Sequence, residues 1–295
     1  MIDSPAPLTP IPYFDLGNDR PPLHFVHANG YPPGCYKPLF EHLQSHYYVY
    51  GMLLRPLWKH SNPKEIHTWK PFSDDLLQFL PLMASGPVIG VGHSIGAVVT
   101  LRAALREPHR SRALVLIDPV LFVPGFLLRW HVVRSLGLGD RLHPLIPGAK
   151  KRRRTFDDLE RLFQRYRSRS IFRYMSDENL RIFIEGITQP KADGGYELVY
   201  SPDWEAQVYR TGMHDFGIWC DLPTLQVPTL FIRGVETDTF LEDAAKLVKQ
   251  KQPKVRVETL EKSTHILPLE RPQDVFDIMQ LFLNETLKVS QTFRV

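Results

Sequence analysis

A single serine flanked by two glycines is the group in this sequence best suited to nucleophilic chemistry. It stands in the pattern G-x-S-x-G, formed by Gly92, His93, Ser94, Ile95 and Gly96. A serine hydroxyl is a weak nucleophile, so it must stand clear of the backbone where a base can take its proton. Glycines two residues before and two residues after the serine leave room for the sharp turn that exposes it. The spacing therefore predicts a nucleophile at Ser94.

The sequence on either side supplies the two elements that such a turn must join. Residues 88–91 form a short apolar run typical of a buried strand, and the apolar spacing of residues 97–105 indicates a helix. The first amides of a helix lack partners within the helix and carry its positive dipole end, so the Ile95 amide is a candidate donor to an oxyanion beside Ser94. The alternative is an ordinary glycine-rich connection between a strand and a helix.

A serine nucleophile also needs a histidine base and a carboxylate that orients the histidine. His265 lies between the last predicted strand and the last predicted helix, so it should reach the same edge of a parallel sheet as Ser94. Asp238 is the favoured acid because it follows a predicted strand and reaches that edge too. The alternatives are Glu236, two residues earlier, and Asp118 at the end of an earlier strand, although an aspartate before a proline is also common in plain turns.

In chain order the three candidates are nucleophile, acid and base, and this order resembles that of the α/β-hydrolase superfamily, with its esterases and lipases. The resemblance covers nearly the whole chain and includes the loops at residues 27–32 and 263–272. It implies an α/β-hydrolase fold, with a mostly parallel sheet, helices on both faces and an inserted helical cap. It also implies a second oxyanion donor, here the Tyr31 amide. That loop departs from the family pattern, because Asn29 precedes Gly30 where many relatives have histidine.

Strands and helices alternate along most of the chain, which favours a parallel sheet. Strands are predicted at residues 11–16, 23–28, 47–53, 88–91, 113–117, 227–233 and 255–260. Helices are predicted at residues 36–46, 73–83 with Ser73 as N-cap, 97–105, 241–251 and 272–288. Between residues 120 and 222 the alternation stops, helical segments dominate, and no strand is predicted. The chain should therefore consist of a core (residues 1–119 and 223–295) and a helical cap (residues 120–222).

Substrate contacts are expected from the cap and from the loops around the serine. A cap excludes water and lines the pocket, so substrate choice should lie there. Val120 and Phe122 belong to its most apolar stretch and are candidate pocket residues, although that stretch could equally pack the cap onto the core. Asn29, Gly30 and His93 are further candidates for contact with substrate.

One dense run of positive charge, KKRRR, extends from Lys150 to Arg154 in the predicted cap. The whole chain has 36 basic and 32 acidic residues, and this net charge of +4 is too modest to indicate nucleic-acid binding. Most such runs are solvated surface. The functional alternative is attraction to acidic substrates or weak contact with an anionic membrane surface.

Cysteine content and apolar patterning favour a soluble cytoplasmic protein. Cys35 and Cys220 are too few for a disulfide framework, and both are expected to be free thiols. The N-terminal sequence lacks the basic and apolar regions of a secretory signal, and no apolar run reaches membrane-spanning length.

These features predict a serine hydrolase that cleaves a small hydrophobic carboxylic ester through an acyl-enzyme, with no metal or organic cofactor. The same scaffold could instead hydrolyse a carbon–carbon bond, thioester, amide or lactone, because fold does not specify substrate. A third hypothesis is a hydrolase-like binding protein without turnover, against which an intact Ser94, Asp238 and His265 argue.

Overall fold

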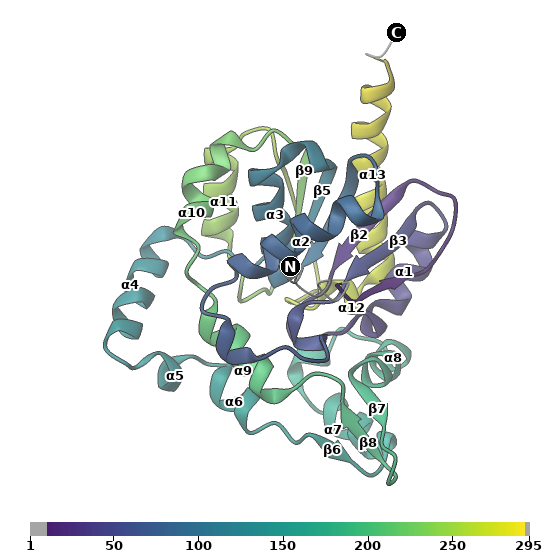
Figure 1. The fold of residues 1–295 in the computed structure, drawn as a ribbon, viewed down its shortest axis with the longest axis vertical. Coiled ribbons are helices and arrows are strands. Elements are labelled where there is room, and N and C mark those ends of the chain that lie inside the picture. The colour runs from purple at the N-terminus through teal and green to yellow at the C-terminus, as the bar shows by residue number, and fades with distance from the viewer. Residues whose placement is uncertain (1–10, 293–295) are drawn as a thin grey trace, which may run out of the picture.

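A seven-stranded sheet forms the centre of the computed structural model, which describes residues 11–292, with side chains as far as residue 287 (Figure 1). Residues 1–10 and 293–295, which the predicted core includes, lie outside the described part. In spatial order the strands are β1 (Tyr13–Asp15), β3 (Tyr48–Met52), β2 (Pro22–Val26), β4 (Val88–His93), β5 (Ser111–Ile117), β9 (Thr229–Gly234) and β10 (Arg256–Leu260). In this sheet β1 runs antiparallel to β3, and every other neighbouring pair is parallel. The predicted α/β-hydrolase fold with a mostly parallel sheet is confirmed.

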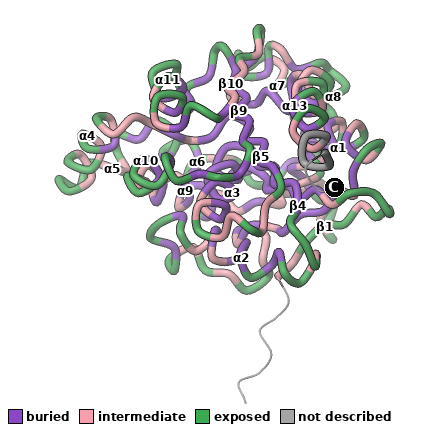
Figure 2. Tube along the Cα trace, turned by 90° about the horizontal axis from the view of Figure 1, so that it is seen from above, coloured by how far each residue is buried: buried purple, intermediate pink, exposed green. Residues whose placement is uncertain are grey.

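Alternate residues of the strands feed two hydrophobic clusters, one on each face of the sheet. In β5, Leu114 and Leu116 belong to one cluster, whereas Ala113, Val115 and Ile117 belong to the other. The helices of the core are α1 (Lys37–Gln44), α2 (Lys70–Met83), α3 (Ile95–Arg106), α11 (Glu242–Lys251), α12 (Leu267–Glu270) and α13 (Pro272–Thr292). Helices α2, α3 and α11 cover the first face, and α1 and α13 cover the second. The strands therefore form a buried interior, as Figure 2 shows.

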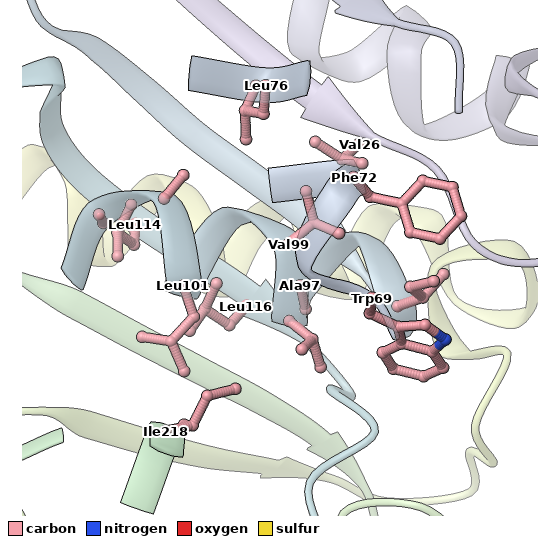
Figure 3. Packing of buried hydrophobic residues seen from close by; sticks show 14 of the residues in the cluster. Val26, Trp69, Phe72, Leu76, Ala97, Val99, Leu101, Leu114, Leu116 and Ile218 are labelled. Carbon is pink, nitrogen blue, oxygen red and sulfur yellow. The ribbon is translucent and has the colours of Figure 1, made fainter. Parts of the chain in front are cut away.

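The first cluster fixes the helix that begins beside Ser94. Figure 3 shows members of this cluster, among them Phe72 of α2, Val99 of α3, Leu116 of β5 and Ile218 of α10 (Phe216–Asp221). Full burial of one such side chain contributes about 1.5–3 kcal/mol relative to exposure. Because the cluster joins the sheet, both helices and α10, the start of α3 is held firmly against β4.

Helix α2 begins earlier than the sequence predicts. The pattern places the N-cap at Ser73, but the helix begins at Lys70 and Ser73 is fully buried inside it. Pro71 accounts for the difference, because proline fits the first turn of a helix, where its missing N–H is not needed.

The chain between β5 and β9 forms what we call the cap segment, residues 120–222, which lies below the sheet in Figure 1 and returns to it at α10. Its other helices are α4 (Pro124–Ser135), α5 (Gly139–Leu142), α6 (Ile146–Lys150), α7 (Leu159–Arg167), α8 (Asp177–Ile187) and α9 (Pro202–Thr211). It also contains an antiparallel sheet of β6 (Thr155–Phe156), β8 (Tyr196–Leu198) and β7 (Thr188–Pro190). The prediction that this segment has no strand is wrong, because strands of two or three residues are too short to show alternation.

Both cysteines are free, as predicted: Cys35 is buried and Cys220 is exposed. Within residues 11–292, the structure contains no helix with the length and apolar character needed to cross a membrane.

Candidate active site

Ser94 occupies the turn between β4 and α3 with φ of 59° and ψ of −120°. A positive φ is unfavourable for a residue with a side chain, so the surrounding packing must hold it. A Cβ on Gly92 would lie 2.3 Å from the carbonyl oxygen of Gly96, and a Cβ on Gly96 would lie 2.1 Å from that of Val26. Both distances are far below van der Waals contact. The two glycines of the pattern are therefore required by the backbone that approaches them.

His265 lies between the hydroxyl of Ser94 and a buried carboxylate. Its Nε2 is 2.9 Å from Ser94 Oγ, and its Nδ1 is 2.7 Å from Asp118 Oδ2. A carboxylate accepts hydrogen bonds, so Nδ1 carries the proton of the neutral ring and Nε2 is left to accept the proton of the serine. This is the arrangement of a nucleophile, a base and an acid that orients the base.

Asp118 is held by several donors besides His265. It accepts hydrogen bonds from the Gly234 amide at 3.1 Å, the Thr237 hydroxyl at 2.5 Å and the Thr239 hydroxyl at 2.8 Å. Its side chain is 0% exposed, so these donors replace the water that the carboxylate has lost. Asp118 also has a positive φ of 41°, which makes it the second strained residue of the site.

The structure corrects the choice of acid, because Asp118 rather than Asp238 contacts the histidine. The threonines on both sides of Asp238 turn their hydroxyls inward to Asp118, which leaves Asp238 on the exposed side of the turn. Glu236 is also exposed, and its carboxylate binds two side chains of the cap segment, Arg173 and Tyr174.

The surroundings of His265 favour its protonated form. Burial alone lowers the pKa of the imidazole, but the hydrogen bond and charge of Asp118 outweigh burial, aided by the charges of Asp238 and Glu270. The pKa of His265 is therefore raised above 6.5. Asp238 acts on the histidine through its charge and makes no hydrogen bond to it in the described part of the chain.

His93 connects three loops of the site. Its Nε2 is 2.9 Å from the carbonyl oxygen of His265, so this nitrogen donates and Nδ1 must accept. The Tyr36 hydroxyl donates to Nδ1 at 2.8 Å and accepts from the Ala28 amide at 3.1 Å. Burial and the neighbouring His265 hold the pKa of His93 well below its usual range. The expectation of substrate contact by His93 is corrected, because its side chain is wholly buried as a bridge.

The Tyr31 amide, predicted as an oxyanion donor, is used within its own loop, where it donates to the Ala28 carbonyl at 3.3 Å. In the described structure, the amides of Asn29 and Ile95 donate to no other protein group. The loop that carries Asn29 follows Val26, the last residue of β2. Because Val26 closely approaches Gly96, this loop begins beside the start of α3. Because the Tyr31 amide is already used, Asn29 becomes a candidate oxyanion donor together with Ile95.

Asn29 and Gly30 also join this loop to the cap segment. Asn29 Nδ2 donates to the Glu205 carbonyl at 3.1 Å, while its Oδ1 is buried without a hydrogen-bond partner among the described residues. Gly30 has φ of 78°, and a Cβ there would lie 3.4 Å from Glu205 Cδ. A buried oxygen without a partner is available to a bound molecule.

Val120 and Phe122 pack against the hydrophobic cluster of the core. The Phe122 carbonyl also accepts a hydrogen bond from Trp219 Nε1 at 2.8 Å. These contacts favour the alternative interpretation of this stretch, in which it packs the cap segment onto the core.

Glu270 holds the loop of His265, a role that the sequence does not predict. Its carboxylate accepts from the Thr264 amide at 2.7 Å and from the Thr264 hydroxyl at 2.9 Å. Burial raises the pKa of Glu270, and these bonds oppose the rise. The spacing of the two residues, six positions apart beside a candidate histidine, is the only sequence signal for this contact.

The arrangement as a whole is suited to nucleophilic attack on a carbonyl group, with proton transfer by a histidine. Among the residues described, no group of three or more His, Cys, Asp or Glu side chains is placed to hold a metal ion.

The chain is similar in sequence to known hydrolases. The sequence profile described as "Alpha/beta hydrolase family" matches residues 25–278. Over 276 residues the chain is 21% identical to (E)-2-((N-methylformamido)methylene)succinate hydrolase of Acinetobacter baylyi, a match that covers 93% of this chain and 94% of that protein. Over 85 residues it is 34% identical to lipase LipV of Mycobacterium tuberculosis, covering 29% of this chain and 33% of the lipase.

Solved structures share the fold. The crystal structure of E-2-(acetamidomethylene)succinate hydrolase matches with a TM-score of 0.74 at 20% identity, covering 92% of this chain and 94% of that chain. At this identity the likeness concerns architecture alone.

Proposed function

The chain belongs to the alpha/beta hydrolase family, and from this premise we propose that it is a serine hydrolase that cleaves a carboxylic ester through an acyl-enzyme. The observation that carries the proposal is the unbroken line of hydrogen bonds from Asp118 through His265 to Ser94, at 2.7 and 2.9 Å. A binding protein without turnover has no need of this alignment.

In the proposed reaction, Ser94 Oγ attacks the carbonyl carbon while His265 Nε2 takes its proton. The negative charge that develops on the carbonyl oxygen is stabilised by the amides of Ile95 and Asn29. Asp118 stabilises the imidazolium ion. His265 then gives the proton to the departing alcohol, which leaves an acyl group on Ser94. In the second half, His265 takes a proton from a water molecule whose oxygen attacks the acyl carbon, and it then gives that proton to Ser94 Oγ as the acid departs.

An amide is the second candidate substrate. The relative that matches along nearly the whole chain is named for a formamide-bearing succinate, whereas the lipase matches over 85 residues only. The same steps would cleave an amide, with His265 protonating a nitrogen leaving group instead of an oxygen.

A fluorophosphonate probe tests the proposal, because it labels a serine only where a base activates the hydroxyl. We expect labelling at Ser94 in the wild-type protein and none in Ser94→Ala. A para-nitrophenyl ester and the matching para-nitroanilide then separate the two substrate classes. Absence of labelling at Ser94 in folded protein, with neither substrate hydrolysed, would favour a binding protein.

A further inference from the structure

A cavity of about 360 Å³ lies between the cap segment and Tyr31. Its charged lining residues are Lys151, Arg152, Arg153, Arg165, Arg169 and Glu205. Five cations thus surround one carboxylate in a space of the size that small-molecule ligands occupy. Three of the cations belong to the charge run that the sequence singles out.

The carboxylate in this cavity is already engaged. Glu205 Oε2 accepts from Arg152 Nη1 at 2.8 Å, and Arg152 Nη2 donates to the Tyr166 hydroxyl at 3.2 Å. Lys151, Arg165 and Arg169 form no ion pair within residues 11–292. The cavity therefore carries an excess of positive charge, whose mutual repulsion an anionic ligand would relieve.

The cavity walls also contain aromatic rings. The guanidinium of Arg169 lies 5.0 Å from the centre of the Tyr166 ring, and the Phe172 ring stacks on Tyr166 at 5.3 Å. Phe183 lies 5.5 Å from Tyr31, ring centre to ring centre. These surfaces suit an apolar or flat body attached to the anionic group.

The cavity adjoins the loop that carries the candidate oxyanion donor. The ring centre of Tyr31, which lines the cavity, is 6.4 Å from that of His93, the residue before Ser94. A Cβ on Gly30 would lie 3.8 Å from Arg152 Nη1, so the basic wall reaches the residue next to Asn29. Ser94 does not itself line the cavity. A ligand held at Ser94 would extend past Tyr31 to reach the cations.

We propose that this cavity binds a free carboxylate of the substrate, so that the preferred substrates are small esters or amides with a carboxylate at the end remote from the reacting carbonyl. The proposal rests on the proposed function for the choice of reacting group. Arginine binds carboxylates through paired hydrogen bonds, which gives direction as well as attraction. The concave shape and the volume favour a small molecule, because a cleft of this size encloses most of such a ligand's surface.

Two esters of equal length test the proposal: para-nitrophenyl hexanoate, which is neutral, and the mono-para-nitrophenyl ester of adipic acid, which ends in a carboxylate. We expect the wild-type protein to show a higher kcat/KM for the adipate ester. Arg165→Gln should lower the ratio of the two kcat/KM values about tenfold, through KM, because one charge-assisted hydrogen bond is lost. Arg165→Gln combined with Arg169→Gln should lower it further.

Arg161→Gln is the matched control, because Arg161 lies on the same helix, one turn before Arg165, and does not line this cavity. It removes the same charge and should change the ratio less than twofold. The proposal is overturned if the wild-type protein shows no preference for the adipate ester. It is also overturned if Arg165→Gln and Arg161→Gln lower the ratio of the two kcat/KM values equally.

Binding to Ser94→Ala separates failure of this proposal from failure of the proposed function, since no turnover is needed. By calorimetry, phenylacetate should bind about tenfold more tightly than phenylacetamide, and added salt should reduce the difference. Equal binding contradicts the proposal even where the fluorophosphonate labels Ser94. Sedimentation with phosphatidylserine vesicles gives the other outcome: if Arg165→Gln weakens vesicle binding but leaves ester selectivity unchanged, the cations serve a lipid surface and the proposal fails.

Discussion

The proposed site has two sides, the catalytic residues at the edge of the sheet and the cationic cavity of the cap segment, and they differ in how their polar groups are held. On the sheet side, the side chain of Asp118 is 0% exposed and that of His265 is 16% exposed, and hydrogen bonds connect every step between them and the nucleophile. On the cap side, Lys151, Arg165 and Arg169 are exposed and have no carboxylate partner in the described part of the chain. The side chains of Asp118, His265 and Ser94 are therefore paired before any ligand arrives, whereas these three cations are not.

Backbone strain also distinguishes the catalytic residues at the edge of the sheet from the residues that line the cavity of the cap segment. Ser94 and Asp118 both have positive φ, and none of the residues with positive φ among those described, glycine aside, lines the cap cavity. Strained residues persist where many contacts hold them. Proton transfer requires that rigidity, because its rate is sensitive to changes of a few tenths of an ångström in the distance between donor and acceptor. Attraction between charges tolerates movement and solvent. Changes on the sheet side should therefore alter turnover of every substrate, and changes on the cap side should alter selectivity.

The largest expected effect is that of Asp118→Asn. Loss of the carboxylate removes the group that fixes the histidine tautomer, so kcat should fall by a factor of roughly 10² to 10⁴ for neutral and anionic esters alike. Steady-state kinetics with both esters measures this. The matched control is Asp238→Asn, which should change kcat less than about threefold. A larger loss of kcat in Asp238→Asn than in Asp118→Asn would identify Asp238 as the acid, as the sequence favours.

The pH dependence of kcat/KM tests the same pair of residues. His265 must be neutral to accept a proton, and its pKa is raised, so half-maximal kcat/KM should lie above pH 6.5. In Asp118→Asn, burial becomes the dominant influence and lowers the pKa, so the residual activity should reach half its maximum at a lower pH. Asp238→Asn should move the midpoint in the same direction by less, because Asp238 is exposed and acts through charge alone. A midpoint below pH 6.5 in the wild-type protein contradicts this account.

Tyr36→Phe probes the hydrogen bonds behind the reacting groups. It leaves two buried partners unpaired, the Ala28 amide and His93 Nδ1. We expect a loss of about 1–3 kcal/mol in the free energy of unfolding, measured in urea. At a temperature where the variant is fully folded, kcat should still fall roughly tenfold with little change in KM, because the loops of Asn29 and His265 lose a shared anchor. An unchanged kcat in folded Tyr36→Phe would assign this network to stability alone.

Arg152→Gln should have the smallest effect on turnover and a measurable effect on stability. Buried Glu205 loses its partner, but the Arg152 side chain is 23% exposed, and we expect a loss of about 1–2 kcal/mol in urea denaturation. The double variant Arg152→Gln with Glu205→Gln should recover part of that loss, because no charge is then left unpaired. Equal stability of all the variants would mean that the pair contributes nothing to holding the cap segment.

The sequence predicts much of this site correctly in position. The strand, turn and helix around Ser94 lie where the pattern places them, and His265 is within hydrogen-bond distance of the serine. It does not identify the acid, since three carboxylates follow strands that end at the same edge of the sheet, and only the inward turn of Thr237 and Thr239 favours Asp118. It also assigns the oxyanion donor to Tyr31, because a pattern of residue types does not show which amide a loop has already used.

The sequence by itself determined what depends on neighbours along the chain: the strained turn at Ser94, the glycines that it requires, and the alternation that produces a parallel sheet. Only the tertiary structure decided which carboxylate contacts His265, which amides are left free, and that Lys151, Arg152 and Arg153 border a cavity. The physical reason is distance along the chain. Asp118 and His265 are 147 positions apart, and their contact exists only because the sheet brings the ends of β5 and β10 to one edge, a placement that no local preference encodes.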